Sequence, residues 1–435
     1  MDNSLLKTKA LILAGGQGTR LQAITKNLIP KPMAKIAGKP ILERAIERLK
    51  DYGIKDIFIS VGFLNEQIRD YFGNGENFGV NIEYIIENEP LGSGGALYFI
   101  KDRIDGNLIV CPGDVIFDVD FYKMLDFHAE KGALITLFAH PNLHPYDSDL
   151  IITDENSAIL SINKKNSPRD FYYKNLVNAG IFVLSPETLG YFNQLKVVNM
   201  EHDFVSHFIS SGKVFAYKSS EYVKDVGTVE RFINAEKDIT NGIVAAKNLK
   251  HKQKAVFLDR DGTINKYKGF IRNIDDIELL PFVSDAIKKI NASGYLAIIV
   301  SNQPVVARGE CTFEQVNKMF DKIETLLGKD GAYIDGIYYC PHHPHSGFFG
   351  EVKELKIDCD CRKPKIGMLK KAEKDFNLDL TKCIMIGDGN LDIQTGINAG
   401  IPTVLVKTGI NDEITLSPDY TADNLLQAVE FFIKD

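Results

Sequence analysis

Two short stretches decide the fold: KALILAGG at residues 9–16 and KAVFLDRDG at residues 254–262. Each is an apolar run that stops abruptly, the first at a pair of glycines and the second at acidic residues. Short apolar runs bounded by turns are typical of the fully buried first strand of a parallel sheet. The sequence therefore predicts that a sheet begins in each half of the chain.

Further strands and helices follow both stretches. Apolar runs lie at 56–61, 107–111, 134–139, 179–184, 296–301, 383–386 and 403–406, with amphipathic segments at 41–52, 281–292 and 313–327 among them. Strands that alternate with helices predict α/β layering. Residues 241–252 (NGIVAAKNLKHK) are polar and basic and show no strand pattern. We expect two α/β domains, 1–240 and 253–435, joined by a linker at 241–252.

Composition narrows the class of partner. The chain has 435 residues, which is enough for two cores, and its net charge of −7 without a basic run argues against nucleic acid. No window approaches the roughly 20 apolar residues of a membrane helix, and the start of the chain lacks a signal-peptide cleavage pattern. Six unevenly spaced cysteines fit a reducing compartment. We expect a cytoplasmic protein that acts on small molecules; the sequence leaves homo-oligomer formation open.

The turn after the first strand reads LAGGQGTRL, residues 13–21. Glycines let the backbone approach a phosphate chain, and successive N–H groups there form a concavity that binds anions. Arg20 adds a fork of donors suited to phosphate oxygens. No Gly-Lys-Ser/Thr follows, so this is not a Walker loop. Taken alone, the turn could serve only to connect a strand to a helix.

Further motifs make residues 8–240 resemble the sugar-1-phosphate nucleotidylyltransferase family. They are PKPM at 30–33, AGKP at 37–40, EPLGSGGA at 89–96, PGD at 112–114, VNAG at 177–180 and DVGT at 225–228. The resemblance implies a Rossmann-like (GT-A-like) sheet and transfer of a nucleotide from a nucleoside triphosphate to a sugar 1-phosphate. EPLGSGGA is most similar to the guanylyltransferases of mannose or heptose 1-phosphates, so GTP is the expected donor.

The same resemblance assigns roles to single residues. It implies that the triphosphate is held by Gly15, Gly16, Gly18, Thr19 and Arg20, and the α-phosphate by Lys31. The base would lie against Gly92, Ser93 and Gly94, the sugar against Asn178, and the sugar phosphate against Lys165. Mg²⁺ would bind Asp114 and Asp225. Taken alone, Asp114 could equally be a loop residue that caps a helix. Relatives usually carry Phe-x-Glu-Lys where this chain has INKK at 162–165, so Lys164 replaces an acid and leaves the sugar-hydroxyl contacts open.

In the second half, FLDRDGT at 257–263 places two carboxylates just past a buried strand, where parallel sheets bind ligands. This spacing suits phosphoryl transfer with one aspartate as nucleophile and the other as general acid and base. On its own, the turn could also be a calcium-binding or structural turn.

Three later motifs are VSNQ at 300–303, CRKP at 361–364 and GD at 387–388. Together with them, this turn resembles the haloacid dehalogenase-like (HAD-like) phosphatases, which implies a Rossmannoid domain. The resemblance implies that Asp259 is the nucleophile and Asp261 the general acid and base. Ser301 and Lys363 would hold the phosphoryl group. Mg²⁺ would bind Asp259, Asp261 and Asp388, and a further acid, Asp392, follows in the sequence. Asn302, Arg308 and Arg362 are the expected substrate contacts. Relatives carry a glycine where this chain has Val305, which reshapes the substrate loop.

Cys340, His342, Cys359 and Cys361 offer three thiolates and an imidazole, a set that describes a structural zinc with no open position. The spacing alone would also allow free buried cysteines. The cluster resembles that of the histidinol-phosphate and heptose-bisphosphate phosphatases, in which it anchors a loop near the active site. His343 and His345 are expected outside the ligand set, and Cys111, Cys311 and Cys383 are expected to be buried.

The two resemblances together favour one pathway. Removing the 7-phosphate from a heptose 1,7-bisphosphate leaves a heptose 1-phosphate, which a guanylyltransferase could convert to GDP-heptose. We therefore expect a bifunctional enzyme of GDP-heptose synthesis that uses GTP and sugar phosphates. Two alternatives stay open: a mannose-1-phosphate guanylyltransferase fused to a histidinol-phosphatase-like enzyme, and a sugar-nucleotide sensor without catalysis.

Overall fold

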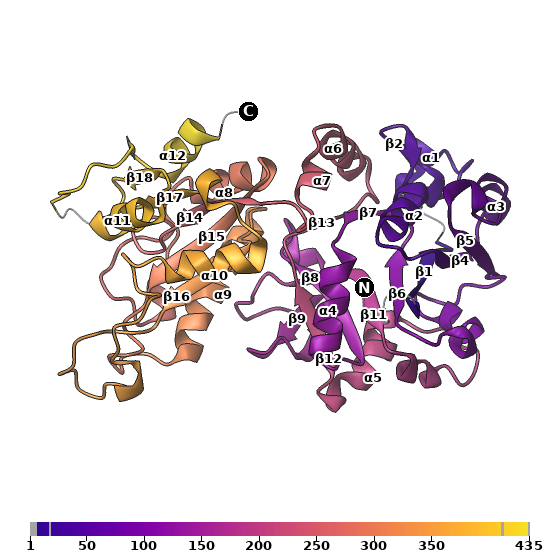
Figure 1. The fold of residues 1–435 in the computed structure, drawn as a ribbon, viewed down its shortest axis with the longest axis horizontal. Coiled ribbons are helices and arrows are strands. Elements are labelled where there is room, and N and C mark those ends of the chain that lie inside the picture. Colours follow the sequence, from indigo (N-terminus) through magenta and orange to yellow (C-terminus); the bar gives the residue numbers. More distant parts are fainter. Residues whose placement is uncertain (1–6, 17–18, 410–412, 434–435) are drawn as a thin grey trace. The chain divides into compact units, whose positions relative to one another are not determined.

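The computed structural model describes residues 7–16, 19–409 and 413–433. They form two compact α/β units, which we describe separately (Figure 1). The first unit runs to His140 and also contains 149–164 and 178–248. The second contains 141–148, 165–177 and the chain from Leu249 onward. The predicted fold class, α/β in both halves, is confirmed. Nothing in the sequence indicated that 141–148 and 165–177 belong with the second unit.

The first unit is built on a nine-stranded mixed sheet. Its order is β10 (Ile159–Asn163), β9 (Leu150–Thr153), β11 (Val177–Leu184), β6 (Leu108–Pro112), β1 (Lys9–Ala14), β4 (Asp56–Val61) and β5 (Asn81–Ile86), with β8 (Ile135–His140) between β11 and β12 (Val214–Lys218). β1 runs parallel to both neighbours, and its Leu11 pairs with Phe58 and Val110. Since Ala10, Leu11 and Ile12 are fully buried, KALILA is a central strand, as predicted.

Helices complete the core of this unit. α2 (Ile41–Asp51) and α4 (Phe121–Glu130) bury their apolar faces against the sheet. The other helices of the unit are α1 (Gln22–Thr25), α3 (Asn65–Phe72), α5 (Ser206–Phe208), α6 (Val229–Thr240) and α7 (Ile243–Ala246). Two small antiparallel ribbons pair β2 (Lys35–Ile36) with β3 (Lys39–Pro40) and β7 (Val115–Asp118) with β13 (Tyr222–Asp225). In the second ribbon Asp225 lies opposite Val115, directly beside Asp114 in the chain.

The second unit contains a sheet of six parallel strands: β16 (Gly336–Cys340), β15 (Tyr295–Asn302), β14 (Lys254–Leu258), β17 (Ile384–Gly387), β18 (Thr403–Val406) and β19 (Tyr420–Ala422). Its helices are α8 (Val283–Ala292), α9 (Phe313–Lys329), α10 (Gly367–Phe376), α11 (Asn390–Ala399) and α12 (Leu425–Phe432). α8, α9 and α12 contribute to the core on one face of the sheet and α10 to the core on the other. Burial on both faces explains why these strands are apolar at nearly every position.

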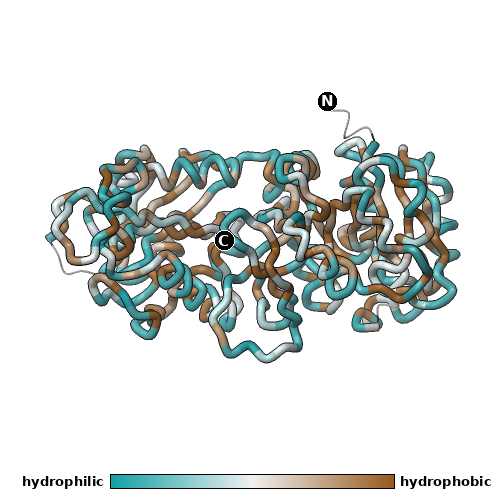
Figure 2. Tube along the Cα trace, turned by 90° about the horizontal axis from the view of Figure 1, so that it is seen from below, coloured by the Kyte–Doolittle hydropathy of each residue, from teal (hydrophilic) through white to brown (hydrophobic). Residues whose placement is uncertain are grey.

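Adjacent strands bring the second unit's polar residues together. β14 lies between β15 and β17, so Asp259, Ser301 and Asp388 meet at the carboxyl ends of three neighbouring strands. In both units the hydrophobic residues concentrate along the interior strands (Figure 2). The strands and helices predicted from the sequence are present within two residues of their predicted ends. In the part of the chain that the structure describes, no helix combines the length and apolar character needed to cross a membrane.

Candidate active sites

A cavity of about 360 Å³ opens where the first sheet's parallel strands end. It is lined by Leu13, Ala14, Gly15, Gly16, Pro32, Ser60, Glu87, Pro90, Gly92, Ser93, Pro112 and Asp114. Gly92 has a φ of 74°, and an added Cβ would lie 2.4 Å from the carbonyl oxygen of Val198, so only glycine fits there. The cavity thus brings together four of the glycines and serines that the sequence assigned to the nucleotide. Gly18 lies outside the described residues.

Lys31 lies between the two predicted magnesium ligands of this site. Its side chain is 5% exposed, and its Nζ donates to Asp114 Oδ2 at 2.7 Å and to Asp225 Oδ1 at 3.1 Å. The fixed position follows from Pro30 and Pro32, which flank the lysine and hold it in a single turn of 3₁₀ helix. Two carboxylates and a lysine from three separate segments of the chain therefore meet here, and one of them, Asp114, lines the cavity.

Additional cations surround Asp225. Burial alone would raise the pKa of this carboxyl, but Lys31, Arg20 and Arg231 together lower the pKa below its usual value. Arg231 Nη1 lies 3.1 Å from Asp225 Oδ2, while the mostly exposed Arg20 lies 3.9 Å from the same oxygen. Sequence reasoning named Arg20 and missed Arg231, although its position three residues after Thr228 in the first turn of α6 could have indicated it.

Asn178 lies near the same end of the sheet and pairs with a buried acid. Its Nδ2 donates to Glu201 Oε1 at 2.9 Å, and burial raises the pKa of Glu201. The next residue back, Met200, donates its N–H to Ser93 Oγ at 2.9 Å, which ties Glu201 to the cavity wall. Sequence reasoning did not find Glu201. Lys165 is not among the residues that line the cavity; it begins the segment 165–177 of the second unit.

Glu87 is a second acid that the sequence did not single out. It lies in the cavity wall, where it accepts hydrogen bonds from the Ser60 hydroxyl and, at 3.2 Å, from the Leu91 N–H. Its position just before EPLG was the available signal, but the motif itself begins two residues later.

In the second unit, Lys363 is the centre of a buried charge cluster. Its Nζ lies 2.7 Å from Asp259 Oδ1 and 2.6 Å from Asp392 Oδ1. Asp259, Asp388 and Asp392 each place a carboxylate oxygen within 4.8 Å of the others. Mg²⁺ binds oxygen donors, usually one or two carboxylates together with substrate phosphates and waters, so carboxylates from this group fit the ion.

This crowding changes the protonation of the expected nucleophile. Burial raises the pKa of Asp259 to about 7; Lys363 opposes the shift, while Asp392, Asp388 and Asp261 add to it. A cation bound among these carboxylates would favour the ionised form and restore the nucleophile.

Asp261 turns toward other partners. The fully buried Arg260 holds it with two guanidinium nitrogens, the shorter contact being 2.7 Å. Gln303 Nε2 donates to Asp261 at 3.1 Å and also to Ser301 Oγ at 2.9 Å. Asp261 is therefore absent from the carboxylate group around Lys363, and its place there is taken by Asp392.

Of the predicted substrate residues of this unit, Asn302 ends β15, and Arg308 and Arg362 lie outside the helices and strands. Asn302 fixes the loop that carries Lys363, which we call the lysine loop. Its side chain accepts from the N–H of Lys363 at 3.0 Å and donates to the carbonyl of Lys363 at 3.1 Å. Arg308 pairs with Glu310 at 2.8 Å and stacks against the rings of Phe270 and Phe348. Arg362 donates to the carbonyl of His342 at 3.2 Å, which joins the lysine loop to the cysteine cluster.

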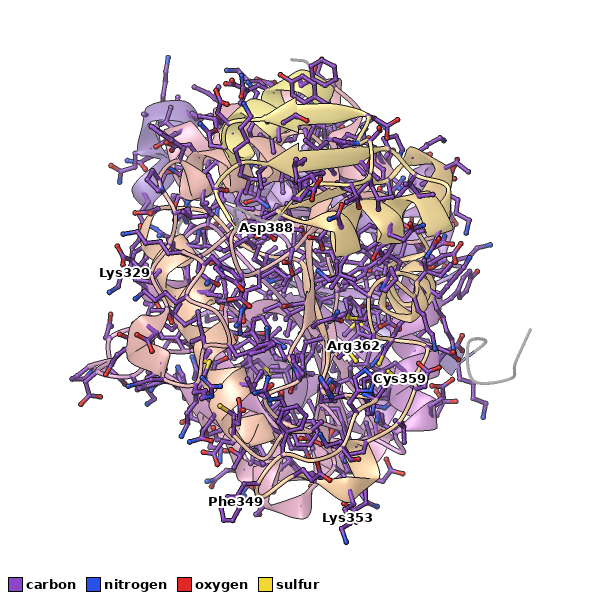
Figure 3. All side chains as sticks on the ribbon, turned by 90° about the vertical axis from the view of Figure 1, so that its left-hand side faces the viewer. Lys329, Phe349, Lys353, Cys359, Arg362 and Asp388 are labelled. Carbon is purple, nitrogen blue, oxygen red and sulfur yellow. The ribbon has the colours of Figure 1, made fainter. Side chains whose placement is uncertain are left out.

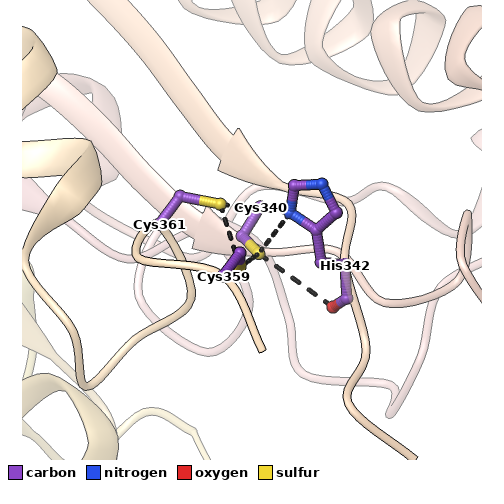
Figure 4. A group of neighbouring side chains, drawn as sticks. All are labelled: Cys340, His342, Cys359 and Cys361. Carbon is purple, nitrogen blue, oxygen red and sulfur yellow. Dashed lines mark hydrogen bonds between the residues drawn. The ribbon is translucent and has the colours of Figure 1, made fainter. Parts of the chain in front are cut away.

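Cys340, His342, Cys359 and Cys361 converge as the sequence suggested (Figure 4). Their sulfurs lie 3.2 and 3.5 Å apart, and His342 Nδ1 lies 3.2 Å from Cys361 Sγ. A tetrahedral zinc with Zn–S bonds of about 2.3 Å needs sulfurs about 3.8 Å apart, so the set fits that ion after a small expansion. Hydrogen bonds from Cys340, Cys359 and His342 lower the pKa of Cys361 to about 5.

The cluster sits beside the lysine loop. Figure 3 shows Cys359 close to Arg362, which Lys363 follows, while the fully exposed Phe349 lies at the outer edge. His345 is exposed, and Cys111, Cys311 and Cys383 are buried and unpaired, as predicted. The cysteine cluster can therefore stabilise the segment that carries Lys363.

Comparison with known proteins separates the same two halves. Residues 9–242, more than half of the chain, match the family described as nucleotidyl transferase, and residues 360–428 match the HAD-hydrolase-like family. The D-glycero-beta-D-manno-heptose-1,7-bisphosphate 7-phosphatase of Haemophilus influenzae is 42% identical over 148 residues, 34% of this chain and 78% of that protein.

Two further matches cover the first half. The UTP–glucose-1-phosphate uridylyltransferase of Synechocystis is 31% identical over 242 residues, 52% of this chain and 62% of that protein. The structure of HddC from Yersinia pseudotuberculosis is similar with a TM-score of 0.46 and 28% identity, over 53% of this chain and 99% of that one. The chain is thus an enzyme that belongs to the nucleotidyl transferase family through its first half and, through its HAD-like second half, to the family of the heptose-bisphosphate 7-phosphatases.

Proposed function

We propose that this enzyme makes GDP-heptose from a heptose bisphosphate in two steps. Its phosphatase removes the 7-phosphate of D-glycero-D-manno-heptose 1,7-bisphosphate, and its transferase then joins GMP from GTP to the remaining 1-phosphate. The fusion carries the proposal: a member of the heptose-bisphosphate 7-phosphatases shares its chain with a nucleotidyl transferase. The product of the first reaction is the type of acceptor that the second requires.

In the phosphatase step, Asp259 attacks the phosphorus of the 7-phosphate, and the bond between phosphorus and the sugar oxygen breaks. Asp261 gives that oxygen its proton and then takes a proton from the water that hydrolyses the aspartyl-phosphate. Lys363 and Ser301 hold the phosphoryl oxygens. Gln303, which bonds both Ser301 and Asp261, keeps the acid beside the phosphoryl position.

In the transferase step, an oxygen of the sugar 1-phosphate attacks the α-phosphorus of GTP, and pyrophosphate leaves. The backbone of Gly15 and Gly16 receives the triphosphate, and Lys31 neutralises charge at the α-phosphate. Asn178 contacts the sugar, and the Gly92–Gly94 loop lies against the base. No covalent intermediate with the protein is needed, because positioning and charge neutralisation are sufficient for such a transfer.

Two kinds of metal complete the proposal. Asp114 and Asp225 in the transferase, and Asp259 with Asp388 in the phosphatase, would hold Mg²⁺, which would neutralise phosphate charge. Zn²⁺ in the cysteine cluster would support the loop that carries Lys363, as a structural ion without an open coordination position. The substrates are those of the cytoplasm, where we expect the enzyme to work.

One reaction mixture tests the proposal. It contains the purified chain, Mg²⁺, heptose 1,7-bisphosphate and equimolar amounts of all nucleoside triphosphates, and mass spectrometry reads the products. A GDP-heptose peak is expected. Heptose 1-phosphate without a sugar nucleotide would contradict the transferase assignment. Untouched bisphosphate would contradict the pathway, with histidinol phosphate and mannose 1-phosphate as the next substrates to compare.

A further inference from the structure

The loop that follows β18 lies beside Asp388, the aspartate that follows β17. The two strands are parallel neighbours, with Gly387 opposite Leu405, so the residues after both strands leave the sheet at the same edge. Asp388 is 6% exposed and belongs to the carboxylate group around Lys363. Residues 407–409, which we call the β18 loop, were not part of any motif that the sequence indicated.

Two glycines enclose the carboxyl group of Asp388. A Cβ added to Gly409 would overlap Asp388 Oδ2, and a Cβ added to Gly262 would lie 2.7 Å from Asp388 Cγ and 2.8 Å from the Cα of Gly409. Gly262 has a φ of 80°, so its backbone favours glycine in any case. Gly409 lies outside the left-handed region, and there the carboxyl group itself excludes a side chain. The carboxyl group therefore rests directly against the backbone of both residues.

Hydrogen bonds fix the chain after β18 at two places. Thr408 Oγ1 donates to the carbonyl of Gly262 at 2.7 Å, which ties the β18 loop to the turn that carries Asp259 and Asp261. Asn390 Nδ2 donates to the carbonyl of Glu413 at 2.9 Å. The chain after β18 is therefore bonded both to the turn after β14 and to the first residue of α11, two positions after Asp388.

Resting on the proposed phosphatase reaction, we propose that Thr408 and Gly409 are positioning residues for Asp388 as a ligand of Mg²⁺. Thr408 holds the β18 loop in place, and the bare backbone of Gly409 sets where the Asp388 carboxyl group lies. Mg²⁺ demands near-ideal octahedral geometry, with bonds of about 2.0–2.1 Å, so a displaced carboxylate binds it weakly. Disturbing the β18 loop should therefore lower the affinity for Mg²⁺, while excess Mg²⁺ should restore the phosphatase rate.

The first variant adds one methyl group where the carboxyl group lies. In Gly409→Ala, the Mg²⁺ concentration that gives half-maximal phosphate release should rise about 10- to 100-fold, the usual effect of changing a group that orients a metal ligand. At saturating Mg²⁺, kcat and KM for the bisphosphate should approach the wild-type values. Lys407→Ala is the matched control, because this neighbouring side chain is exposed and pairs with Asp423 at the surface.

The second variant removes one hydrogen bond and leaves Gly409 in place. Thr408→Val keeps the shape of the side chain but cannot donate to the Gly262 carbonyl. The half-maximal Mg²⁺ concentration should rise about three- to tenfold, which corresponds to one hydrogen bond. Thr408→Ser keeps the donor and should restore the wild-type value. Nucleotidyl transfer from supplied heptose 1-phosphate should keep its Mg²⁺ dependence in all of these variants.

Mn²⁺ binding, followed by electron paramagnetic resonance, gives a readout without substrate, because Mn²⁺ binds the same oxygen donors. Binding that is lost in Asp388→Asn belongs to the phosphatase site. That binding should weaken about tenfold in Gly409→Ala and less in Thr408→Val. Amide exchange in β17 and β18 checks the fold, and if Gly409→Ala loses this protection, Thr408→Val decides the outcome.

Unchanged Mn²⁺ and Mg²⁺ affinities in a folded variant would overturn the inference. A rate that stays low at saturating Mg²⁺ while Mn²⁺ binds normally would do so too, since it would indicate a general structural role. Mn²⁺ binding that survives in Asp388→Asn would remove the ligand that the loop is said to position. A wild type that releases no phosphate from the bisphosphate would contradict the proposed function, whereas the Mn²⁺ measurements would still test this inference.

Discussion

A buried lysine stands at the centre of each site, and the two lysines differ in the charges around them. Lys31 pairs with Asp114 and Asp225, and Arg20 and Arg231 bring further positive charge. Lys363 pairs with Asp259 and Asp392, and Asp388 adds negative charge. The transferase centre therefore has a surplus of cations, whereas the phosphatase centre has a surplus of carboxylates.

The pKa values follow this difference. The cations around Asp225 lower its pKa, while burial and neighbouring acids raise the pKa of Asp259 to about 7. A surplus of positive charge prepares the first site for a triphosphate, which brings its own negative charge. In the second site burial and the neighbouring acids disfavour the ionised form of Asp259, and a bound cation would favour it. The same motif, a lysine between two acids, thus serves opposite electrostatic needs.

The largest expected effect comes from removing the nucleophile. Asp259→Asn should lower phosphate release by at least about 10⁴-fold, because the amide cannot attack phosphorus. Formation of GDP-heptose from supplied heptose 1-phosphate should be spared. Both rates are measured on one preparation, with Asp285→Asn, 59% exposed on α8, as the control. A parallel fall in both activities would show that the two sites are not independent.

Removing the transferase lysine should have the converse effect on the two activities. In Lys31→Met, Asp114 and Asp225 face the triphosphate without their shared cation, and nucleotidyl transfer should fall about 10²- to 10³-fold. Phosphatase kcat/KM should remain that of the wild type. Lys35→Met, which changes an exposed lysine on β2, is the matched control. Equal transfer rates in the two variants would remove Lys31 from the mechanism.

The residues around these lysines show how far sequence can predict a site. Asp259 and Asp388 could be predicted because each follows an apolar strand in a parallel sheet, whose carboxyl ends converge. The contact between Lys31 and Asp225 joins residues 194 positions apart through the short β7–β13 ribbon, which has too few residues to show a periodic pattern. The turn of Asp261 toward Arg260 depends on side-chain packing, which periodicity does not report.

The segments 141–148 and 165–177 of the second unit mark another limit. Residues 165–177 form no helix or strand apart from the start of β11. They are held by bonds between side chains and backbone: Arg169 donates to the Ser148 carbonyl, and the Tyr173 N–H donates to the Thr325 hydroxyl. Such contacts leave no repeating apolar signal in the sequence. Glu201 was missed for a related reason, since a buried acid looks like any surface acid until its partner Asn178 is placed.

The cysteine cluster allows a milder test of how the phosphatase lysine is held. A protein with Cys359→Ser and Cys361→Ser should lose about one equivalent of zinc, measured by elemental analysis, because two of four ligands are gone. Phosphate release should fall about 10- to 100-fold as the Lys363 loop loosens, and nucleotidyl transfer should not change. His345→Gln should keep its zinc. Zinc retained by the double variant would contradict the assigned ligand set.

The smallest effect extends the contrast between the units to pH. In the first unit, burial lowers the pKa of His128 to about 4, and its ring bonds Thr136 and Ser185 at 2.8 and 3.0 Å. Because the folded state binds the proton less well than the unfolded chain, this stability is complete above the unfolded pKa and is lost as pH falls toward 4. Acid has the opposite effect on the metal-free second unit, where protonation of Asp259 relieves repulsion.

Hydrogen exchange of the β8 and β11 amides can measure the stability of the first unit alone. Between about pH 7 and pH 5, its free energy of unfolding should drop by about 2 kcal/mol through His128. His128→Gln should be less stable at neutral pH but should lack this part of the slope, whereas His251→Gln, at an exposed site, should retain it. An identical slope in the His128 variant would mean that other groups control the acid response. A shared slope in both units would contradict the expected opposite responses of their stabilities to acid.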